Sequence, residues 1–246
     1  MGAHRLAAGG GSAGRHAAGL RGAPSSLATA ALLTVMACCL PLTGAAAGGA
    51  STTATGGPAA KTVLCLGDSL TAGLGLQPDQ AFPHLLQERI DARGWNFRVV
   101  NAGVSGETSA GGLRRISWLL RSPFEVLVLE LGANDALRGL PLADTRQNLQ
   151  AIIDRVRQTN PRVRIIIAGM LAPPNLGQEY TAEFRSIFPQ LAERNHALLI
   201  PFLLDGVAAR PELNQADGIH PNGEGQRIVA DNVWRLLEPL LRSLIE

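Results

Sequence analysis

The chain has 246 residues, enough for one well-buried domain and too few for two domains of ordinary size plus an extension. Hydrophobic residues make up 46% of the chain and aromatic residues only 4%, which predicts an aliphatic core. The formal net charge of +2 comes from residues 1–47, because the rest of the chain has 19 basic and 20 acidic side chains and offers no basic stripe for nucleic acid.

Residues 1–47 are typical of an export signal. A Gly/Ala-rich stretch with three arginines precedes an apolar run at residues 27–42, and small residues follow at 45–47. The apolar run is too short to span a bilayer comfortably, and it ends in a cleavage-like Ala-x-Ala. We therefore expect a bacterial protein that is periplasmic or secreted, with no stable membrane span in the mature chain. Two alternatives stay open: a lipoprotein anchored at Cys38, and an uncleaved anchor.

The chain after the signal divides into a tether and one domain. Residues 48–60 contain only Gly, Ala, Ser, Thr and Pro, which predicts a flexible tether. Residues 61–246 then alternate between apolar runs and helical spacing. The apolar runs predict strands at residues 62–66, 97–100, 126–131, 162–168 and 197–201. The helical spacing predicts helices at residues 81–93, 111–120, 144–159, 181–194 and 222–244, the last interrupted at Pro239.

This alternation predicts an α/β fold with a five-stranded parallel sheet covered by helices on both faces. Cys65, the one cysteine outside the signal, falls in the first strand and is expected to be a small buried residue. In a doubly wound sheet, sites form beyond the carboxyl ends of the strands. Ser69, Gly106 and Asn134 follow the first three predicted strands, and His220 follows the fifth. We expect these four residues to converge at one edge of the sheet.

Three of the candidate residues together suit acyl transfer. A serine hydroxyl is a poor nucleophile at neutral pH, so it needs an imidazole to take its proton and a carboxylate to orient that imidazole. Ser69 in Gly67-Asp68-Ser69-Leu70, Asp217 and His220 supply these groups in the order Ser, Asp, His. Asp217 precedes His220 by three residues, so a tight turn brings its carboxylate to Nδ1.

Two further residues are candidates for an oxyanion hole. The backbone N–H groups of Ser69 and Gly106 and the side-chain amide of Asn134 are the donors that we expect to stabilise the tetrahedral anion. We expect neighbouring polar residues to fix loop geometry rather than to react; these are Asp68, Asn101 and Asp135. The remaining histidines outside the signal are expected at packing or surface positions; these are His84 and His196.

Other enzyme motifs are absent from the turn that follows the first predicted strand. It lacks the second glycine of the Gly-x-Ser-x-Gly elbow, which argues against an ordinary α/β-hydrolase. It also lacks Gly-x-Gly-x-x-Gly and the Lys-Ser/Thr ending of a P-loop, so nucleotide binding is not indicated.

With these motifs in place, residues 62–244 resemble the SGNH hydrolase superfamily, also called GDSL esterases. Within it they resemble the bacterial arylesterase branch, which includes the periplasmic acyl-CoA thioesterase I, also described as protease I and lysophospholipase L1. The matching blocks come in the family's order: Leu66-Gly67-Asp68-Ser69-Leu70-Thr71-Ala72-Gly73, Asn101-Ala102-Gly103-Val104-Ser105-Gly106-Glu107-Thr108-Ser109, Leu129-Glu130-Leu131-Gly132-Ala133-Asn134-Asp135, Leu137-Arg138-Gly139 and Asp217-Gly218-Ile219-His220-Pro221-Asn222. The chain departs from the family at Ala133, where glycine is usual, and in the loop at residues 171–177.

The resemblance implies a flavodoxin-like three-layer α/β/α sandwich. It implies the triad Ser69, Asp217 and His220, an oxyanion hole of Ser69, Gly106 and Asn134, and no metal or cofactor. The implied activity is hydrolysis of carboxylic esters and thioesters, including aryl esters and lysophospholipids, by a monomer. If the protein is exported, coenzyme A is not available there, which favours lysophospholipids or other acyl esters.

Two other readings stay open. One is a carbohydrate acetylesterase of the same superfamily. The other is an exported binding module that keeps the fold without catalysis, although such a module has no need of all five site residues.

Overall fold

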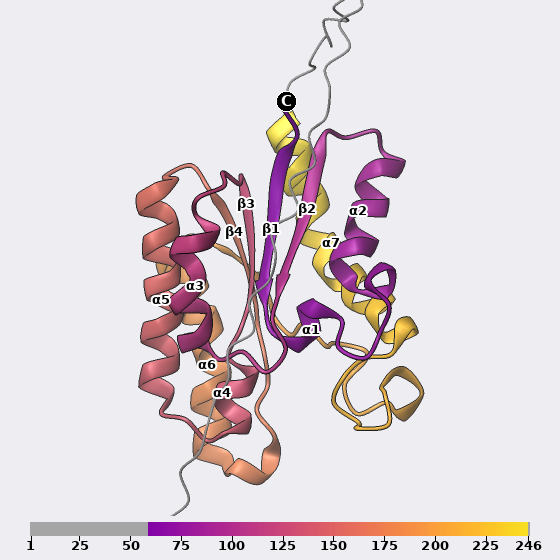
Figure 1. Ribbon diagram of the computed structural model, residues 1–246. Coiled ribbons are helices and arrows are strands. Elements are labelled where there is room, and N and C mark those ends of the chain that lie inside the picture. The colour runs from indigo at the N-terminus through magenta and orange to yellow at the C-terminus, as the bar shows by residue number, and fades with distance from the viewer. Residues whose placement is uncertain (1–58, 246) are drawn as a thin grey trace, which may run out of the picture. The chain divides into compact units, whose positions relative to one another are not determined.

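The computed structural model describes residues 59–245, and its centre is a five-stranded sheet with helices on both sides (Figure 1). All strands are parallel, and their spatial order is β2-β1-β3-β4-β5. This is the flavodoxin-like order, so the predicted fold class is confirmed. The strands are β1 (Lys61–Gly67), β2 (Phe97–Gly103), β3 (Val126–Glu130), β4 (Arg164–Ala168) and β5 (Leu198–Ile200).

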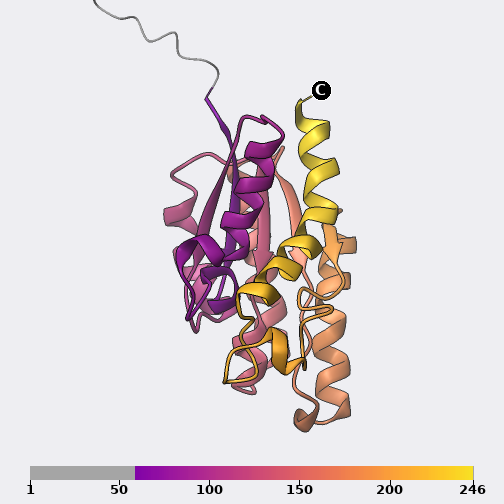
Figure 2. The ribbon, with the colours of Figure 1, turned by 90° about the vertical axis from the view of Figure 1, so that its right-hand side faces the viewer.

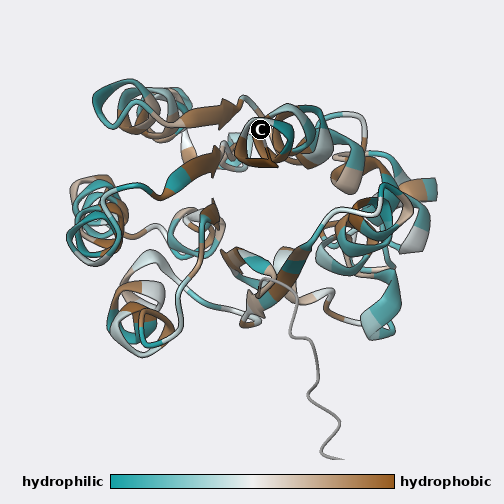
Figure 3. Cartoon of the chain, turned by 90° about the horizontal axis from the view of Figure 1, so that it is seen from above, coloured by the Kyte–Doolittle hydropathy of each residue, from teal (hydrophilic) through white to brown (hydrophobic). Residues whose placement is uncertain are grey.

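Helices form the two outer layers. The longer helices are α2 (Phe82–Ala92), α3 (Ser109–Leu119), α5 (Leu142–Thr159), α6 (Gln178–Arg194) and α7 (Gly223–Ile245). Figure 1 shows α3, α5 and α6 on one face of the sheet, and Figure 2 shows α2 and α7 side by side on the other. Viewed from above, the strands in the middle layer are coloured mostly hydrophobic, whereas the outer helices carry both hydrophobic and hydrophilic residues (Figure 3). Each outer helix therefore buries one apolar face.

The core is aliphatic, as the composition predicts. In β3 every residue is buried, and in β1 every residue after Lys61 is buried. Cys65 lies in β1 with none of its surface exposed, and burial raises the pKa of its thiol to about 12. It therefore stays a neutral, packed thiol, as expected.

The predicted interruption at Pro239 was wrong, because α7 continues through it to Ile245. A proline inside a helix removes one backbone hydrogen bond and costs about 3 kcal/mol. Its neighbours Leu237, Leu240 and Leu241 are all buried against the core. Since burying one leucine contributes roughly 1.5–3 kcal/mol, the packing of these leucines outweighs the lost hydrogen bond, and the helix continues.

Several short elements were not predicted. Two short helices follow β1 and β3, namely α1 (Ser69–Ala72) and α4 (Ala133–Leu137). Three 3-10 turns also occur, at Pro78–Gln80, Pro174–Leu176 and Pro211–Leu213. A single turn leaves no periodic apolar pattern, so sequence spacing does not reveal such elements.

Within residues 59–245, none of the helices combines the length and the apolar character needed to cross a bilayer. The predicted signal, the lipoprotein alternative at Cys38 and most of the predicted tether lie outside the described residues.

Candidate active site

The strands end together, and this brings the candidate residues to one edge of the sheet. Gly67 at the end of β1 pairs in register with Gly103 of β2 and with Glu130 of β3. Figure 1 shows α1, α4 and the loops that follow β4 and β5 at this same end. The convergence expected from the sequence follows from this common register.

Ser69 stands at the tightest of these turns. Asp68 caps α1 by accepting the N–H of Leu70 at 2.9 Å, which makes Ser69 the first residue of the helix. The turn needs glycine at position 67, since a Cβ there would lie 2.0 Å from Oγ1 of Thr71. Ser69 is 7% exposed, and its hydroxyl faces the loop that carries His220.

Three side chains form a hydrogen-bonded series at this edge. Oγ of Ser69 lies 2.8 Å from Nε2 of His220, and Nδ1 of His220 lies 2.6 Å from Oδ2 of Asp217. The other oxygen of Asp217 accepts the backbone N–H groups of Ile219 at 2.9 Å and of His220 at 3.0 Å. Gly218 makes this tight turn with φ +72°, a conformation that favours glycine.

Those hydrogen bonds fix the charge of Asp217. The backbone N–H of His220, then that of Ile219, then the imidazole lower the pKa of its carboxyl to about 2. The carboxylate is therefore ionised at neutral pH. Nδ1 of His220 must then carry a proton to bond with it, which leaves Nε2 as the acceptor for a serine proton.

The two proposed oxyanion residues lie on neighbouring loops. Nδ2 of Asn134, in α4, donates to Oδ2 of Asp68 at 2.9 Å, next to Ser69. Gly106 has φ +77° in the loop after β2, and its carbonyl accepts a hydrogen bond from Arg138 at 2.8 Å. The N–H of Val104 donates to the carbonyl of Gly67 at 3.0 Å and ties that loop to the end of β1.

The residues expected to fix loop geometry do make loop contacts. Asn101 donates to the carbonyl of Thr71 at 2.9 Å and accepts the N–H of Gly103 at 2.9 Å. Asp135 accepts the N–H of Ser109 at 2.8 Å. Two histidines lie elsewhere, as expected: His84 lies on α2 beside Glu88, and His196 lies in the loop before β5.

One polar residue beneath the site was missed. Glu130, the last residue of β3, has none of its surface exposed. Its Oε2 accepts the N–H of Asp68 at 3.0 Å and the hydroxyl of Thr71 at 2.8 Å. The signal in the sequence was a glutamate within an otherwise apolar run, since glutamate is almost never fully buried without a partner.

A cavity of about 480 Å³ opens beside Ser69 and His220. Its size falls within the range of small-molecule sites. Most of its wall is apolar and comes from the loops after β4 and β5; these residues are Met170, Leu171, Ala172, Pro173, Pro174, Phe202, Leu204, Ala208 and Ala209. The site therefore combines a polar end, at Ser69 and His220, with an apolar wall suited to a hydrocarbon group.

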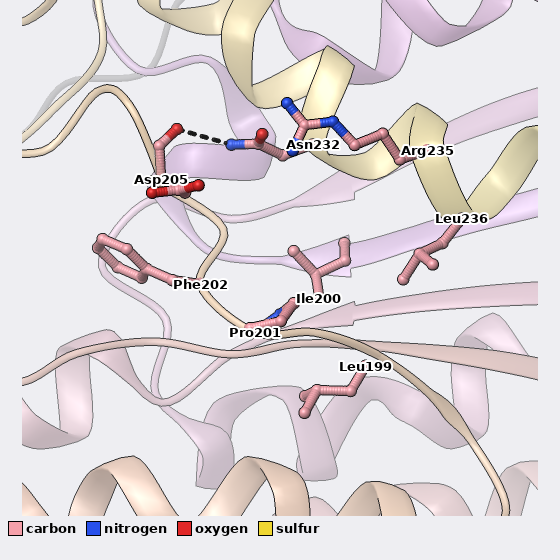
Figure 4. A pocket seen from close by; sticks show the side chains of 8 residues that line it. All are labelled: Leu199, Ile200, Pro201, Phe202, Asp205, Asn232, Arg235 and Leu236. Atoms are coloured by element: carbon pink, nitrogen blue, oxygen red, sulfur yellow. Dashed lines mark hydrogen bonds between the residues drawn. The ribbon is translucent and has the colours of Figure 1, made fainter.

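A second cavity, of about 370 Å³, lies between β5 and α7 (Figure 4). Nδ2 of Asn232 donates to the backbone carbonyls of Leu203 and Asp205 at 2.9 Å each. Neither Ser69 nor His220 lines this cavity. Ser69 and His220 therefore line the first cavity and not the second.

Comparison with known proteins identifies the family of this chain. Residues 65–228 match the GDSL-like Lipase/Acylhydrolase family. The chain is 42% identical to esterase TesA of Pseudomonas aeruginosa over 184 residues, which are 74% of this chain and 90% of that protein. It is 40% identical to thioesterase 1/protease 1/lysophospholipase L1 of Escherichia coli over 185 residues, which are 74% of this chain and 86% of that protein.

A solved structure gives the same result for the fold. The crystal structure of TesA superposes with a TM-score of 0.70 at 40% sequence identity, covering 73% of this chain and 99% of that one. Sequence, fold and relatives agree on hydrolysis of carboxylic esters. The chain belongs to the GDSL-like Lipase/Acylhydrolase family and is a serine esterase.

Proposed function

We propose that Ser69, His220 and Asp217 form the catalytic triad of this esterase. The hydrogen-bonded series from Asp217 through His220 to Ser69 is the observation that supports this assignment most strongly. Nε2 of His220 takes the proton of Ser69 as Oγ attacks the ester carbonyl. The ionised Asp217 holds the imidazole in the required tautomer and stabilises the imidazolium that forms.

The tetrahedral anion is stabilised by the N–H groups of Ser69 and Gly106 and by the amide of Asn134. His220 then gives its proton to the leaving alcohol or thiol, and the acyl group remains on Ser69. Water loses a proton to His220, attacks the acyl-enzyme and releases the acid by the same route. Each step moves one proton through Nε2 of His220.

The substrate that we propose is an ester of a medium or long acyl chain, such as a lysophospholipid or an aryl or thio ester. The support is the apolar wall of the cavity beside Ser69. The printed name of the Escherichia coli relative, which includes thioesterase and lysophospholipase activities, points the same way. A carbohydrate acetylesterase has little use for such a wall, so this alternative is an outcome of the test below.

Hydrolysis of p-nitrophenyl esters from C2 to C12, by the purified protein and by Ser69→Ala, tests the proposal. We expect activity that extends to medium or long chains, with a burst of p-nitrophenol that is absent in the variant. Full activity in a folded Ser69→Ala protein would sink the triad assignment. Activity confined to acetate would favour sugar deacetylation, and no activity in either protein would favour a binding module.

We further propose that residues 1–47 are a cleaved export signal, that residues 48–60 are a tether, and that residues 61–246 form the hydrolase domain of a periplasmic or secreted monomer. Mass spectrometry of the protein recovered from the periplasm and medium of a bacterial host tests the cleavage. A fatty-acylated N-terminus at Cys38 would support the lipoprotein alternative instead. Light scattering of the recovered protein tests the monomer.

A further inference from the structure

A buried carboxyl group lies directly beneath the proposed oxyanion hole. One oxygen of Glu130 accepts two hydrogen bonds, from the N–H of Asp68 and from the hydroxyl of Thr71. No donor group among residues 59–245 reaches the other oxygen, Oε1. A carboxylate in a buried site needs donors on both oxygens, whereas a protonated carboxyl group can itself donate from the second.

Asp68 connects this carboxyl group to Asn134. Asp68 is 1% exposed, and its Oδ1 accepts the N–H of Leu70 at 2.9 Å. Its Oδ2 accepts one N–H of the Asn134 amide at 2.9 Å. An amide nitrogen carries two N–H groups, so fixing the direction of one also fixes the direction of the other.

The charges of the two acids differ. Burial raises the pKa of Glu130 well above its usual range, and the negative charge of Asp68 raises it further. Burial also raises the pKa of Asp68, but the N–H of Leu70, the carboxyl of Glu130 and the amide of Asn134 all favour its anion. Of the two groups, Glu130 is therefore the one whose surroundings favour the proton, and Asp68 the one with more donors for a negative charge.

We propose that Glu130 is a positioning residue for ester hydrolysis. Its carboxyl group donates a hydrogen bond to the carboxylate of Asp68, and Asp68 in turn holds the Asn134 amide with its second N–H directed at the oxyanion. This inference rests on the proposed function, which makes Asn134 an oxyanion donor. The direction of the Asn134 amide is then set by two successive hydrogen bonds, from Glu130 to Asp68 and between Asp68 and Asn134, and not by the short helix α4 that carries Asn134.

A purely structural role makes a different prediction. If Glu130 only fastens β3 to α1 through Thr71, its loss would lower stability or disturb the site in general. The factor by which loss of Glu130 lowers kcat would then multiply the factor caused by any other active-site substitution, because the two effects would be independent. If Glu130 acts through Asn134, removing it after Asn134 is gone should cost nothing more in kcat.

The experiment is a double-mutant cycle of Glu130→Leu and Asn134→Ala, with Glu130→Gln alongside. Leucine fills the space without hydrogen bonds, whereas glutamine keeps the oxygen acceptor and supplies an N–H in place of the carboxyl proton. The matched control is Glu125→Gln and Glu125→Leu, at a glutamate that precedes β3 at the opposite end of the sheet. kcat and KM on a p-nitrophenyl ester and thermal unfolding are measured for every variant.

We expect Asn134→Ala to lower kcat by about 10²–10³ and Glu130→Leu to lower it by at least about tenfold, each with little change in KM. The double variant should be no slower than Asn134→Ala alone. Glu130→Gln should keep kcat within about threefold, and the Glu125 variants should leave it unchanged. If Glu130→Leu does not fold, Glu130→Met takes its place in the cycle, since methionine adapts to irregular space.

Three outcomes would overturn the proposal: an unchanged kcat in folded Glu130→Leu, effects of Glu130 and Asn134 that multiply, or a Glu130→Gln protein as slow as Glu130→Leu. Failure of the proposed function looks different. Asn134→Ala would then keep full kcat, or Ser69→Ala would remain active, whatever the Glu130 variants do.

Discussion

Nδ1 of His220 lies 2.6 Å from Oδ2 of Asp217, which is only three residues earlier in the chain. Both residues belong to one turn, so their mutual geometry is set locally. The turn is attached to the loop after α1 through Gln215, whose side chain donates to the carbonyl of Leu74 at 2.7 Å. The imidazole and the carboxylate are thus a local unit, and only the contact with Ser69 depends on the whole fold.

Asp217→Asn should remove the charge that orients His220 while keeping the size of the side chain. We expect kcat to fall by roughly 10⁴, the cost of losing an orienting aspartate in a serine triad, with little change in KM. Steady-state kinetics on a p-nitrophenyl ester measure this. The control is Asp231→Asn, at an exposed residue of α7 that forms an ion pair with Arg89 of α2. This variant should leave kcat unchanged. A drop of less than about tenfold at position 217 would contradict the assigned role.

Asp217 should stay ionised as the pH falls. The backbone N–H of His220, then that of Ile219, lower the pKa of its carboxyl from 3.8 to about 2, so the carboxyl should keep its charge from pH 8 to about pH 4. The 13C chemical shift of this carboxyl, assigned by comparison with Asp217→Asn, should therefore be constant over that range. A change of the shift with a midpoint at or above pH 3.8 would contradict the role of these hydrogen bonds.

Arg138 should influence the rate through the Gly106 loop. Its guanidinium donates to the carbonyl of Gly106 at 2.8 Å, so Arg138→Ala should loosen that loop and lower kcat by about tenfold, less than the roughly 10²–10³ expected for a lost oxyanion donor. Arg155→Ala is a matched control, because Arg155 is also exposed and donates to a backbone carbonyl, that of Leu113, at 2.9 Å. Equal effects of the two variants on kcat would count against the loop contact.

A bulky residue in the apolar wall should shorten the preferred acyl chain. Ala172 lines the cavity beside Ser69. Ala172→Trp should therefore reduce the space for long acyl groups without reducing the space for an acetyl group. Losing the burial of two methylenes, at about 0.8 kcal/mol each, costs about 15-fold in kcat/KM. The ratio of C10 to C2 ester hydrolysis measures this. Ala182→Trp, at an exposed position on α6, is the control, and a ratio unchanged in both variants would exclude the cavity as the acyl site.

Stability should depend on pH through Glu130. Its pKa in the folded protein is raised above the ordinary value of 4.5, so folding favours the protonated form. This contribution is complete below about pH 4.5 and is lost as the pH rises toward the folded-state pKa. Glu130→Gln cannot ionise, so its Tm relative to the unchanged protein should rise from pH 5 to pH 8. A Tm difference that stays constant over this range would show that Glu130 does not titrate.

The sheet and the location of the candidate site are predictable from the sequence for related reasons. Buried parallel strands read as continuous apolar runs, and a site at their carboxyl ends places Ser69, Gly106 and Asn134 directly after three such runs. The features that the sequence does not reveal depend on contacts between distant segments. Nothing near Glu130 in sequence reveals that its carboxyl group meets the backbone of Asp68, 62 residues earlier. In the same way, the continuation of α7 through Pro239 depends on the core beneath it.

The groups of the candidate site come from different strand ends. Ser69, the Gly106 loop and Asn134 follow β1, β2 and β3, which end in register. His220 and Asp217 share the region after β5 with part of the apolar wall. The loop after β4 contributes wall residues and none of the proposed triad or oxyanion residues. Exchanging residues 171–177 for the corresponding loop of a relative should transfer that relative's preference among acyl chains and leave the reacting groups where they are.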